Sequence, residues 1–304
     1  MSMIVSHAAA APETYWKSVL PNAPMPKSLT QLLNNDKSMD ILAKDTTKVG
    51  RRGSTNPFYY LYAATDDQLQ DDPNLTLFFL ENDLQRGKEM NLHFTKTTGP
   101  SSTFLPRRVA DTITFSSKKL PELYARLAIK PDMVESQSMK QTISECEDKG
   151  MEGEEKYCAT SLEAMLDFST SKLGNEVKAI STEVKYTREM TTPLHKYTIK
   201  GVKKLADRAV VCHKLNYPYA VFYCHKTDTT ALVYAVSLVG EDSTKAKAVA
   251  ICHTDTTKWN PKHLAFRVLK VKPGTTSVCH FLPEDHIVWV PNYVYPHGFY
   301  RVFK

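Results

Sequence analysis

Four Cys-His dipeptides in the last third of the chain constrain its fold more than any other feature. They are Cys212-His213, Cys224-His225, Cys252-His253 and Cys279-His280. Ten residues separate the first dipeptide from the second, 26 the second from the third, and 25 the third from the fourth. With ten His in 304 residues, four such dipeptides among six Cys have a chance probability on the order of 10⁻⁵. The pattern therefore does not come from composition.

The residues before each dipeptide predict β-strands. Short runs of β-branched or aromatic residues occupy positions 209–211, 220–223, 248–251 and 276–278. Neighbouring side chains on a strand point to opposite faces, so a Cys and the His after it cannot easily bind the same small ion. We therefore expect the cysteines on one face of these strands and the four histidines on the other.

Three interpretations fit this geometry. In a secreted chain, the cysteines form disulfides while the imidazoles converge on a transition metal. Thiolates and imidazoles could instead build zinc sites together, although the sequence lacks the close Cys-x2-Cys and His-x3-His pairs of zinc fingers. In the third interpretation, the histidines are hydrogen-bonded structural residues at strand ends.

The six cysteines are even in number and compatible with three disulfides in an oxidising compartment. Cys146 and Cys158 would enclose an 11-residue loop. Closing such a loop contributes roughly 2–3 kcal/mol in the chain-entropy model. The remaining cysteines would link strands among themselves, but the sequence does not give the connectivity. They are Cys212, Cys224, Cys252 and Cys279.

The dipeptide series resembles the hallmark of the plant BURP-domain proteins, which carry four Cys-His pairs at near-identical spacings followed by a Trp. Trp289 stands at the matching position. Residues 77–81, 104–107, 157–163 and 168–171 extend the resemblance upstream. It predicts a BURP domain over residues 76–304, preceded by an extended or linker region over residues 1–75. The stretch from Tyr15 to Pro21 is also typical of these precursors.

Some members of this family are copper-dependent peptide cyclases, which join a Tyr or Trp side chain to a nearby atom of a short core peptide carried in the same precursor. The resemblance implies Cu²⁺ as cofactor and the chain's own N-terminal segment as substrate. The aromatic segment 56–64 is then the candidate core peptide, with Tyr59, Tyr60 and Tyr62 as candidate crosslinked residues. The chain departs from the scheme because it has no tandem core repeats and no Trp between Trp16 and Trp259.

Four imidazoles without a carboxylate triad suit copper, which binds neutral histidine readily. The proposed ligands that the resemblance implies are His213, His225, His253 and His280. The sequence does not divide them between one ion and two. His286 and His297 lie near the last pair and are candidates for additional or supporting ligands, with a structural role as the alternative for each.

A second function class stays open: a non-catalytic cell-wall, seed or stress-associated BURP protein in which the Cys-His array only builds the fold. Both classes imply the secretory pathway, with the apoplast, cell wall or vacuole as destination. The net charge of +6 suits weak association with an anionic cell-wall polysaccharide. The sequence shows no aromatic-basic nucleic-acid module and no apolar run of about 18 residues that could span a membrane.

The remaining patterns predict an α+β fold, with helices mostly in the first half of the domain and strands in the second. Prolines favour an extended lead-in over residues 1–30. Helices are expected at 120–127, 136–147 and 161–170. Besides the four Cys-His strands, further strands are expected at 75–79, 90–94, 110–115, 179–187, 196–199, 230–239 and 265–271.

Overall fold

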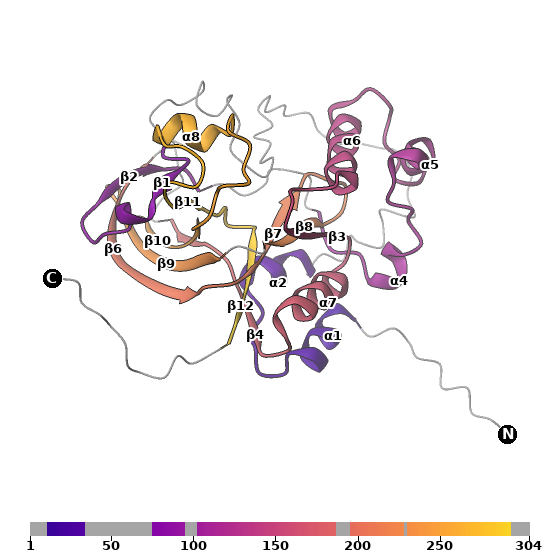
Figure 1. Ribbon diagram of the computed structural model, residues 1–304. Coiled ribbons are helices and arrows are strands. Elements are labelled where there is room, and N and C mark those ends of the chain that lie inside the picture. The colour runs from indigo at the N-terminus through magenta and orange to yellow at the C-terminus, as the bar shows by residue number, and fades with distance from the viewer. Residues whose placement is uncertain (1–10, 34–74, 95–101, 187–194, 228–229, 293–304) are drawn as a thin grey trace.

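A computed structural model describes residues 11–33, 75–94, 102–186, 195–227 and 230–292 of the chain (Figure 1). Helices are concentrated in the first half and strands in the second, which confirms the α+β class. Three disulfides lie between residues 146 and 279 and join all six cysteines. The predicted disulfide-stapled, strand-rich part of the chain is therefore present.

The described helices include the three that the sequence predicts, which are α5, α6 and α7. Ser161 begins α7 because its Oγ accepts a hydrogen bond from the backbone N–H of Ala164 at 3.1 Å. Gly174 ends the same helix with a φ of +85°, a conformation that glycine adopts without strain. The bounds are α1 (Pro12–Val19), α2 (Lys27–Leu33), α4 (Arg107–Ala110), α5 (Leu120–Arg126), α6 (Val134–Glu147), α7 (Leu162–Leu173) and α8 (Leu264–Leu269).

The strands form two sheets in which every described pair is antiparallel. The larger sheet has the order β1-β11-β10-β9-β6-β2, and β5 pairs with the first residues of β10, which β11 does not reach. The smaller sheet has the order β3-β8-β7-β12-β4. The larger sheet contains β1 (Phe79–Leu80), β2 (Glu89–Leu92), β5 (Glu183–Lys185), β6 (His195–Ala206), β9 (Ala231–Gly240), β10 (Lys245–His253) and β11 (Val278–Phe281). The smaller contains β3 (Glu154–Ala159), β4 (Val177–Ile180), β7 (Val210–Leu215), β8 (Val221–Thr227) and β12 (Ile287–Pro291).

A buried aliphatic layer joins the two sheets. Val211 and Val288 of the smaller sheet pack in one cluster with Val233, Val249 and Ile251 of the larger sheet. The opposite face of the smaller sheet is covered by α1, α2 and α7 (Figure 1). Each Cys-His dipeptide therefore lies on a strand with one side chain available to the layer between the sheets and the other to an outer core.

The N-terminal segment is helical where the sequence analysis expects an extended lead-in. Pro12 occupies the first turn of α1, a position where its missing N–H costs nothing. Trp16 is buried, lies 5.4 Å from Trp289 between ring centroids, and donates its Nε1–H to the Ala23 carbonyl at 2.9 Å. The prolines therefore limit the length of the helices, and burial of Trp16 holds them on the domain core.

Two predicted strands are wrong. Residue 110 ends the short helix α4 and residues 111–115 form a turn and irregular chain after it, whereas residues 264–269 form α8 in place of a strand over 265–271. The side chain of His263 accepts a hydrogen bond from the Ala265 N–H at 3.2 Å and begins α8. Leu264 and Phe266 then pack into a small core under that helix. A short apolar run of this kind fits either a strand or a buried helix, and periodicity alone does not separate them.

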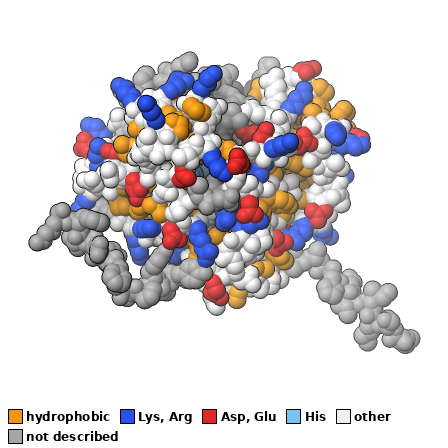
Figure 2. Space-filling view, viewed as in Figure 1, with side chains coloured by type: hydrophobic (Ala, Val, Ile, Leu, Met, Phe, Trp, Pro, Cys, Tyr) orange, Lys and Arg blue, Asp and Glu red, His pale blue; other side chains and the backbone are white. Residues whose placement is uncertain are grey.

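No helix in the described ranges has the length and apolar character needed to cross a membrane. On the face shown in Figure 2, basic and acidic side chains are interspersed over the surface. The excess of 39 basic over 33 acidic residues is therefore not gathered into one basic patch on that face.

Candidate metal centre

The disulfides fix the register of the strands that carry the histidines. Cys212 of β7 lies directly opposite Cys224 of β8, and the two form a disulfide. Cys252 of β10 and Cys279 of β11 are paired in the same way. The cysteines of the first pair face the core beneath α1 and α7, and those of the second face the outer core of the larger sheet. The third disulfide, Cys146–Cys158, joins the end of α6 to β3.

The histidines point to the other side of the same strands and meet. His213 and His225 stack with ring centroids 5.3 Å apart, and His253 and His280 stack at 5.6 Å. The two pairs are near enough to affect each other's ionisation, because a charge on His253 or His280 would lower the pKa of His213. The predicted separation of thiol and imidazole faces is therefore present, and the structure gathers the four dipeptide histidines as two stacked pairs, together called the histidine cluster.

His286 is a fifth member of this cluster. It lies in the turn before β12, with its Nδ1 2.9 Å from Nδ1 of His213. On the other side of the His213 ring, its Nε2 lies 3.2 Å from the Nε2 of His225. His213 thus stands between two imidazoles and contacts each through a different ring nitrogen. The second candidate, His297, lies outside the described residues, as do Tyr59, Tyr60 and Tyr62.

Burial favours the neutral form of four of these imidazoles. It lowers the pKa of His213 and His253 well below 6.5, and neighbouring histidines lower both values further. Burial also lowers the pKa of His280 and of His286 to about 4. A neutral His213 carries one proton, so it donates to one of its two neighbours and accepts from the other. Neutral imidazole is the form that binds metal ions.

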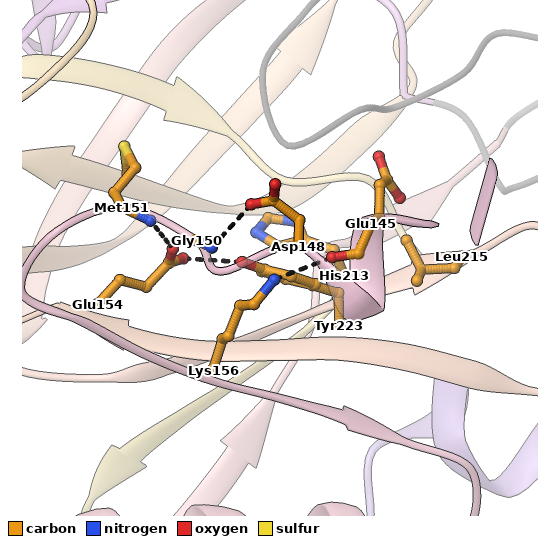
Figure 3. Close-up of a pocket in the computed structure, with 9 residues that line it drawn as sticks. All are labelled: Glu145, Asp148, Gly150, Met151, Glu154, Lys156, His213, Leu215 and Tyr223. Carbon is orange, nitrogen blue, oxygen red and sulfur yellow. Dashed lines mark hydrogen bonds between the residues drawn. The ribbon is translucent and has the colours of Figure 1, made fainter. Parts of the chain in front are cut away.

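Glu154 at the start of β3 supports the cluster from beneath. Its carboxylate side chain is 2 % exposed and accepts from Nδ1 of His225 at 3.1 Å. The same oxygen accepts from the Tyr223 hydroxyl at 3.1 Å, and the second oxygen accepts from the Met151 backbone N–H at 2.9 Å (Figure 3). A carboxylate on Nδ1 leaves the Nε2 of His225 directed at His213, which is the arrangement that orients metal-binding histidines.

His253 and His280 have a more aromatic setting. The ring of His253 lies 5.0 Å from that of Trp259, and Trp259 in turn lies 4.7 Å from His263. The Nδ1 of His280 lies 3.3 Å from the Phe281 carbonyl. This half of the cluster is therefore held by ring packing, whereas the His213 half is held by a carboxylate.

The donors fit copper in kind. The Nε2 atoms of His213 and His225 are separated by 3.2 Å, a spacing that suits two donors each about 2 Å from one ion. Within the described part of the chain, however, no three or more His, Cys, Asp or Glu side chains are already arranged to hold one metal ion. The structure therefore presents pairs of imidazole ligands, and at least one imidazole–imidazole contact would have to be replaced by a bond to the metal ion on binding.

Glu154 is a site residue that the sequence patterns did not predict. It lies four residues before Cys158 on β3, so the two share a face of that strand, and this is the signal that could have found it. Its contact with His225 depends on the pairing of β3 with β8, which the sequence does not specify. Tyr223 shares a face of β8 with His225, two residues later, and contacts the same carboxylate.

The fold and the cluster define a disulfide-bonded protein of two antiparallel sheets with a buried imidazole site between them. A family model for the BURP domain matches residues 77–291. The chain belongs to the BURP-domain family.

Its relatives are plant proteins. The chain is 56% identical over 247 residues to BURP domain protein RD22 of Arabidopsis thaliana, covering 79% of this chain and 62% of that protein. It is 54% identical over 239 residues to BURP domain-containing protein 3 of rice, covering 77% and 54%. It is 46% identical over 291 residues to rice BURP domain-containing protein 5, covering 93% and 88%. The chain thus spans little more than half to about three fifths of the length of the first two.

Proposed function

We propose that this chain is a secreted copper-binding BURP protein that crosslinks a tyrosine of its own N-terminal segment by oxidation and so closes a peptide macrocycle. The observation that supports this proposal best is the gathering of five histidines, in which burial lowers the pKa of all but His225. They are His213, His225, His253, His280 and His286. Neutral histidines gathered without intervening carboxylates are the donor set that copper prefers among the common divalent ions.

Copper bound there would supply one-electron oxidation, with dioxygen as the terminal oxidant. Crosslinking removes two hydrogen atoms from the peptide: the phenol O–H and one C–H or X–H bond break, and one new bond forms between the tyrosine and its neighbour. The chain's own residues orient the site. Glu154 holds the Nδ1–H of His225, and Tyr223 donates its hydroxyl proton to the same carboxylate oxygen.

Secretion is the second part of the proposal. All six cysteines are paired in disulfides, and such bonds persist in oxidising compartments. The apoplast, the cell wall and the vacuole are destinations of that pathway. A secreted location also supplies the dioxygen that the oxidation consumes.

Metal loading followed by intact-mass measurement tests the proposal. Purified, oxidised protein is incubated with Cu(II) in air and desalted, and its copper content and mass are measured. Firmly held copper together with a loss of two hydrogen atoms that maps to residues 56–64 is the expected result. A variant with His213→Asn and His253→Asn is the control and should lose both. Copper-loaded protein of unchanged mass would refute the cyclase activity, and absence of retained copper would refute the metal centre.

One observation favours a non-catalytic alternative. The imidazoles of His213, His225 and His286 already contact one another as hydrogen-bonding partners, so the cluster has a structural role without metal. In that case the protein is a cell-wall, seed or stress-associated scaffold, with an anionic polysaccharide as the partner its net charge of +6 suits. The same loading experiment separates the two functions.

A further inference from the structure

A pocket of about 260 Å³ lies beside the histidine cluster. Its walls come from the end of α6, the turn that follows, and the paired strands β3, β7 and β8 (Figure 3). The residues that line it are Glu145, Asp148, Gly150, Met151, Glu154, Lys156, His213, Leu215 and Tyr223. Of the five clustered histidines, His213 alone lines this pocket.

The lining becomes progressively more buried from mouth to floor. Asp148 is exposed, and Glu145 and Lys156 are half-buried. Leu215 is 6 % exposed and His213 is 5 % exposed. The pocket therefore connects the surface with the imidazole that stands between two others in the cluster.

The mouth of the pocket is held in shape by covalent and polar contacts. The Cys146–Cys158 disulfide ties the wall formed by α6 to the wall formed by β3. Lys156 donates its Nζ–H to the Glu145 backbone carbonyl at 2.9 Å across the same gap. The turn between the walls closes on itself, because the Gly150 N–H donates to Asp148 Oδ1 at 2.7 Å. These contacts indicate a preformed cavity.

The size and chemistry of the pocket select one kind of ligand. A volume below the roughly 300 Å³ at which drug-sized ligand sites begin suits a single side chain and is too small for a chain of sugars. The ring of Tyr223 and the side chains of Leu215 and Met151 give flat and apolar walls. Carboxylates at the mouth and floor accept hydrogen bonds and repel an acidic group. The Lys156 ammonium is engaged with the Tyr223 ring, 5.2 Å from its centroid.

We propose that this pocket is the subsite through which a tyrosine side chain of a peptide substrate reaches His213. Its ring would lie against Tyr223 and Leu215, with its hydroxyl directed toward the Glu154 carboxylate and the histidine cluster. The inference rests on the proposed function, because it names where the oxidised residue would enter.

The chain's own tyrosines can reach this pocket. Tyr59 lies 16 residues before Leu75 and Tyr62 lies 13 residues before it, so the extended chain on this shorter side reaches about 55 Å from Tyr59 and about 45 Å from Tyr62. A globular chain of this size has a diameter of about 50 Å. Tether length therefore allows Tyr59, Tyr60 or Tyr62 to enter in cis, and a peptide from another chain could enter in trans.

Binding of a free tyrosine analogue to the full chain tests the subsite without metal. Tyr59, Tyr60 and Tyr62 are replaced by Phe so that the chain's own phenols cannot compete. N-acetyltyrosinamide is then titrated into the metal-free protein and followed by saturation-transfer NMR, with N-acetylphenylalaninamide as the analogue that lacks the hydroxyl. We expect the tyrosine analogue to bind more tightly than the phenylalanine analogue. Equal binding of the two, or no binding, would overturn the proposal.

Filling the pocket provides the second measurement. Met151→Trp, at a half-buried wall position, should weaken binding of the analogue by about tenfold or more. Tyr157→Trp is the matched control, because Tyr157 follows Lys156 on β3, is 44% exposed and stacks on Phe168 away from the pocket. An unchanged affinity in Met151→Trp would overturn the proposal.

The failures of the two proposals are distinguishable. When Met151→Trp is made in the chain that keeps its own Tyr59, Tyr60 and Tyr62, the variant should retain bound copper but should no longer show the mass change in residues 56–64. Analogue binding without copper retention would sink the proposed function and leave the subsite. Copper retention and crosslinking that persist in Met151→Trp would refute the subsite and leave the function.

Discussion

Acidification of the metal-free protein tests the buried histidine cluster most directly. Burial lowers the pKa of His280 and His286 to about 4 and lowers that of His213 and His253 well below 6.5. Such an imidazole binds fewer protons in the folded chain than in the unfolded chain at any pH between its two pKa values. The free energy of unfolding therefore falls as the pH decreases from about 6.5 toward 4.

The magnitude follows from these values. Between pH 7 and about pH 5.5, each of the four histidines lowers the free energy of unfolding by about 1 kcal/mol, and together by roughly 4–5 kcal/mol. Glu145 acts in the opposite direction, because burial raises its pKa to about 7 and the folded chain takes up its proton first. Protonation of Glu145 raises the free energy of unfolding by about 1–2 kcal/mol over the same pH range, so the net decrease is roughly 3 kcal/mol. Folded domains have only about 5–15 kcal/mol in total.

Urea unfolding at several pH values between pH 7 and about pH 5.5 measures this loss. The protein is kept oxidised and metal-free, and the free energy is extrapolated to zero urea. Glu145→Gln should steepen the loss by about 1–2 kcal/mol, because it removes the opposing group. His253→Gln should reduce it by about 1 kcal/mol. A stability in Glu145→Gln that stays constant or rises on acidification would show that the histidines are not buried as neutral groups.

Three further predictions concern single contacts. Glu154→Gln should weaken Cu(II) affinity by about 10- to 100-fold and alter the electron paramagnetic resonance spectrum of bound copper, whereas exposed Glu155→Gln should change neither. Trp16→Ala should lower the free energy of unfolding by about 3–5 kcal/mol in urea titrations, and exposed Lys17→Ala by less than about 0.5 kcal/mol. Replacing both cysteines of the β10–β11 disulfide with serine should destabilise the domain by about 3 kcal/mol, seen as a lower melting temperature.

The opposite orientation of the Cys and His side chains within each dipeptide could be predicted from sequence, because it depends only on the alternation of side chains along a strand. Once residues 209–213 form a strand, Val211 and His213 share a face and Cys212 takes the other. The pairing of Cys212 with Cys224 could not be predicted. It depends on the register of the β7–β8 hairpin, which places Lys214 opposite Phe222 and so sets every pair beyond it.

The contacts of the supporting residues could not be predicted for a different reason. His286 was a candidate ligand because it lies near the last dipeptide, but it lies in a turn, where no periodicity assigns a face, and its contact with His213 depends on the pairing of β12 with β7. Glu154 contacts His225, which lies 71 positions later in the chain, only because β3 pairs with β8. Residues 265–271 were misassigned because a short, largely apolar run of this kind satisfies a strand as well as the helix α8.

The way in which α1 and α2 are held on the domain determines what proteolytic cleavage of the chain would leave behind. All three covalent bridges lie between residues 146 and 279, so α1 and α2 are retained on the domain by noncovalent contacts. These include the burial of Trp16 and Leu29 and the hydrogen bond that the Tyr15 hydroxyl donates to Asp167. A protease that nicked the polypeptide between Leu33 and Leu75 would leave a two-chain particle, its small N-terminal fragment still seated. Excision of a peptide from that interval would then leave the domain's hydrophobic face covered.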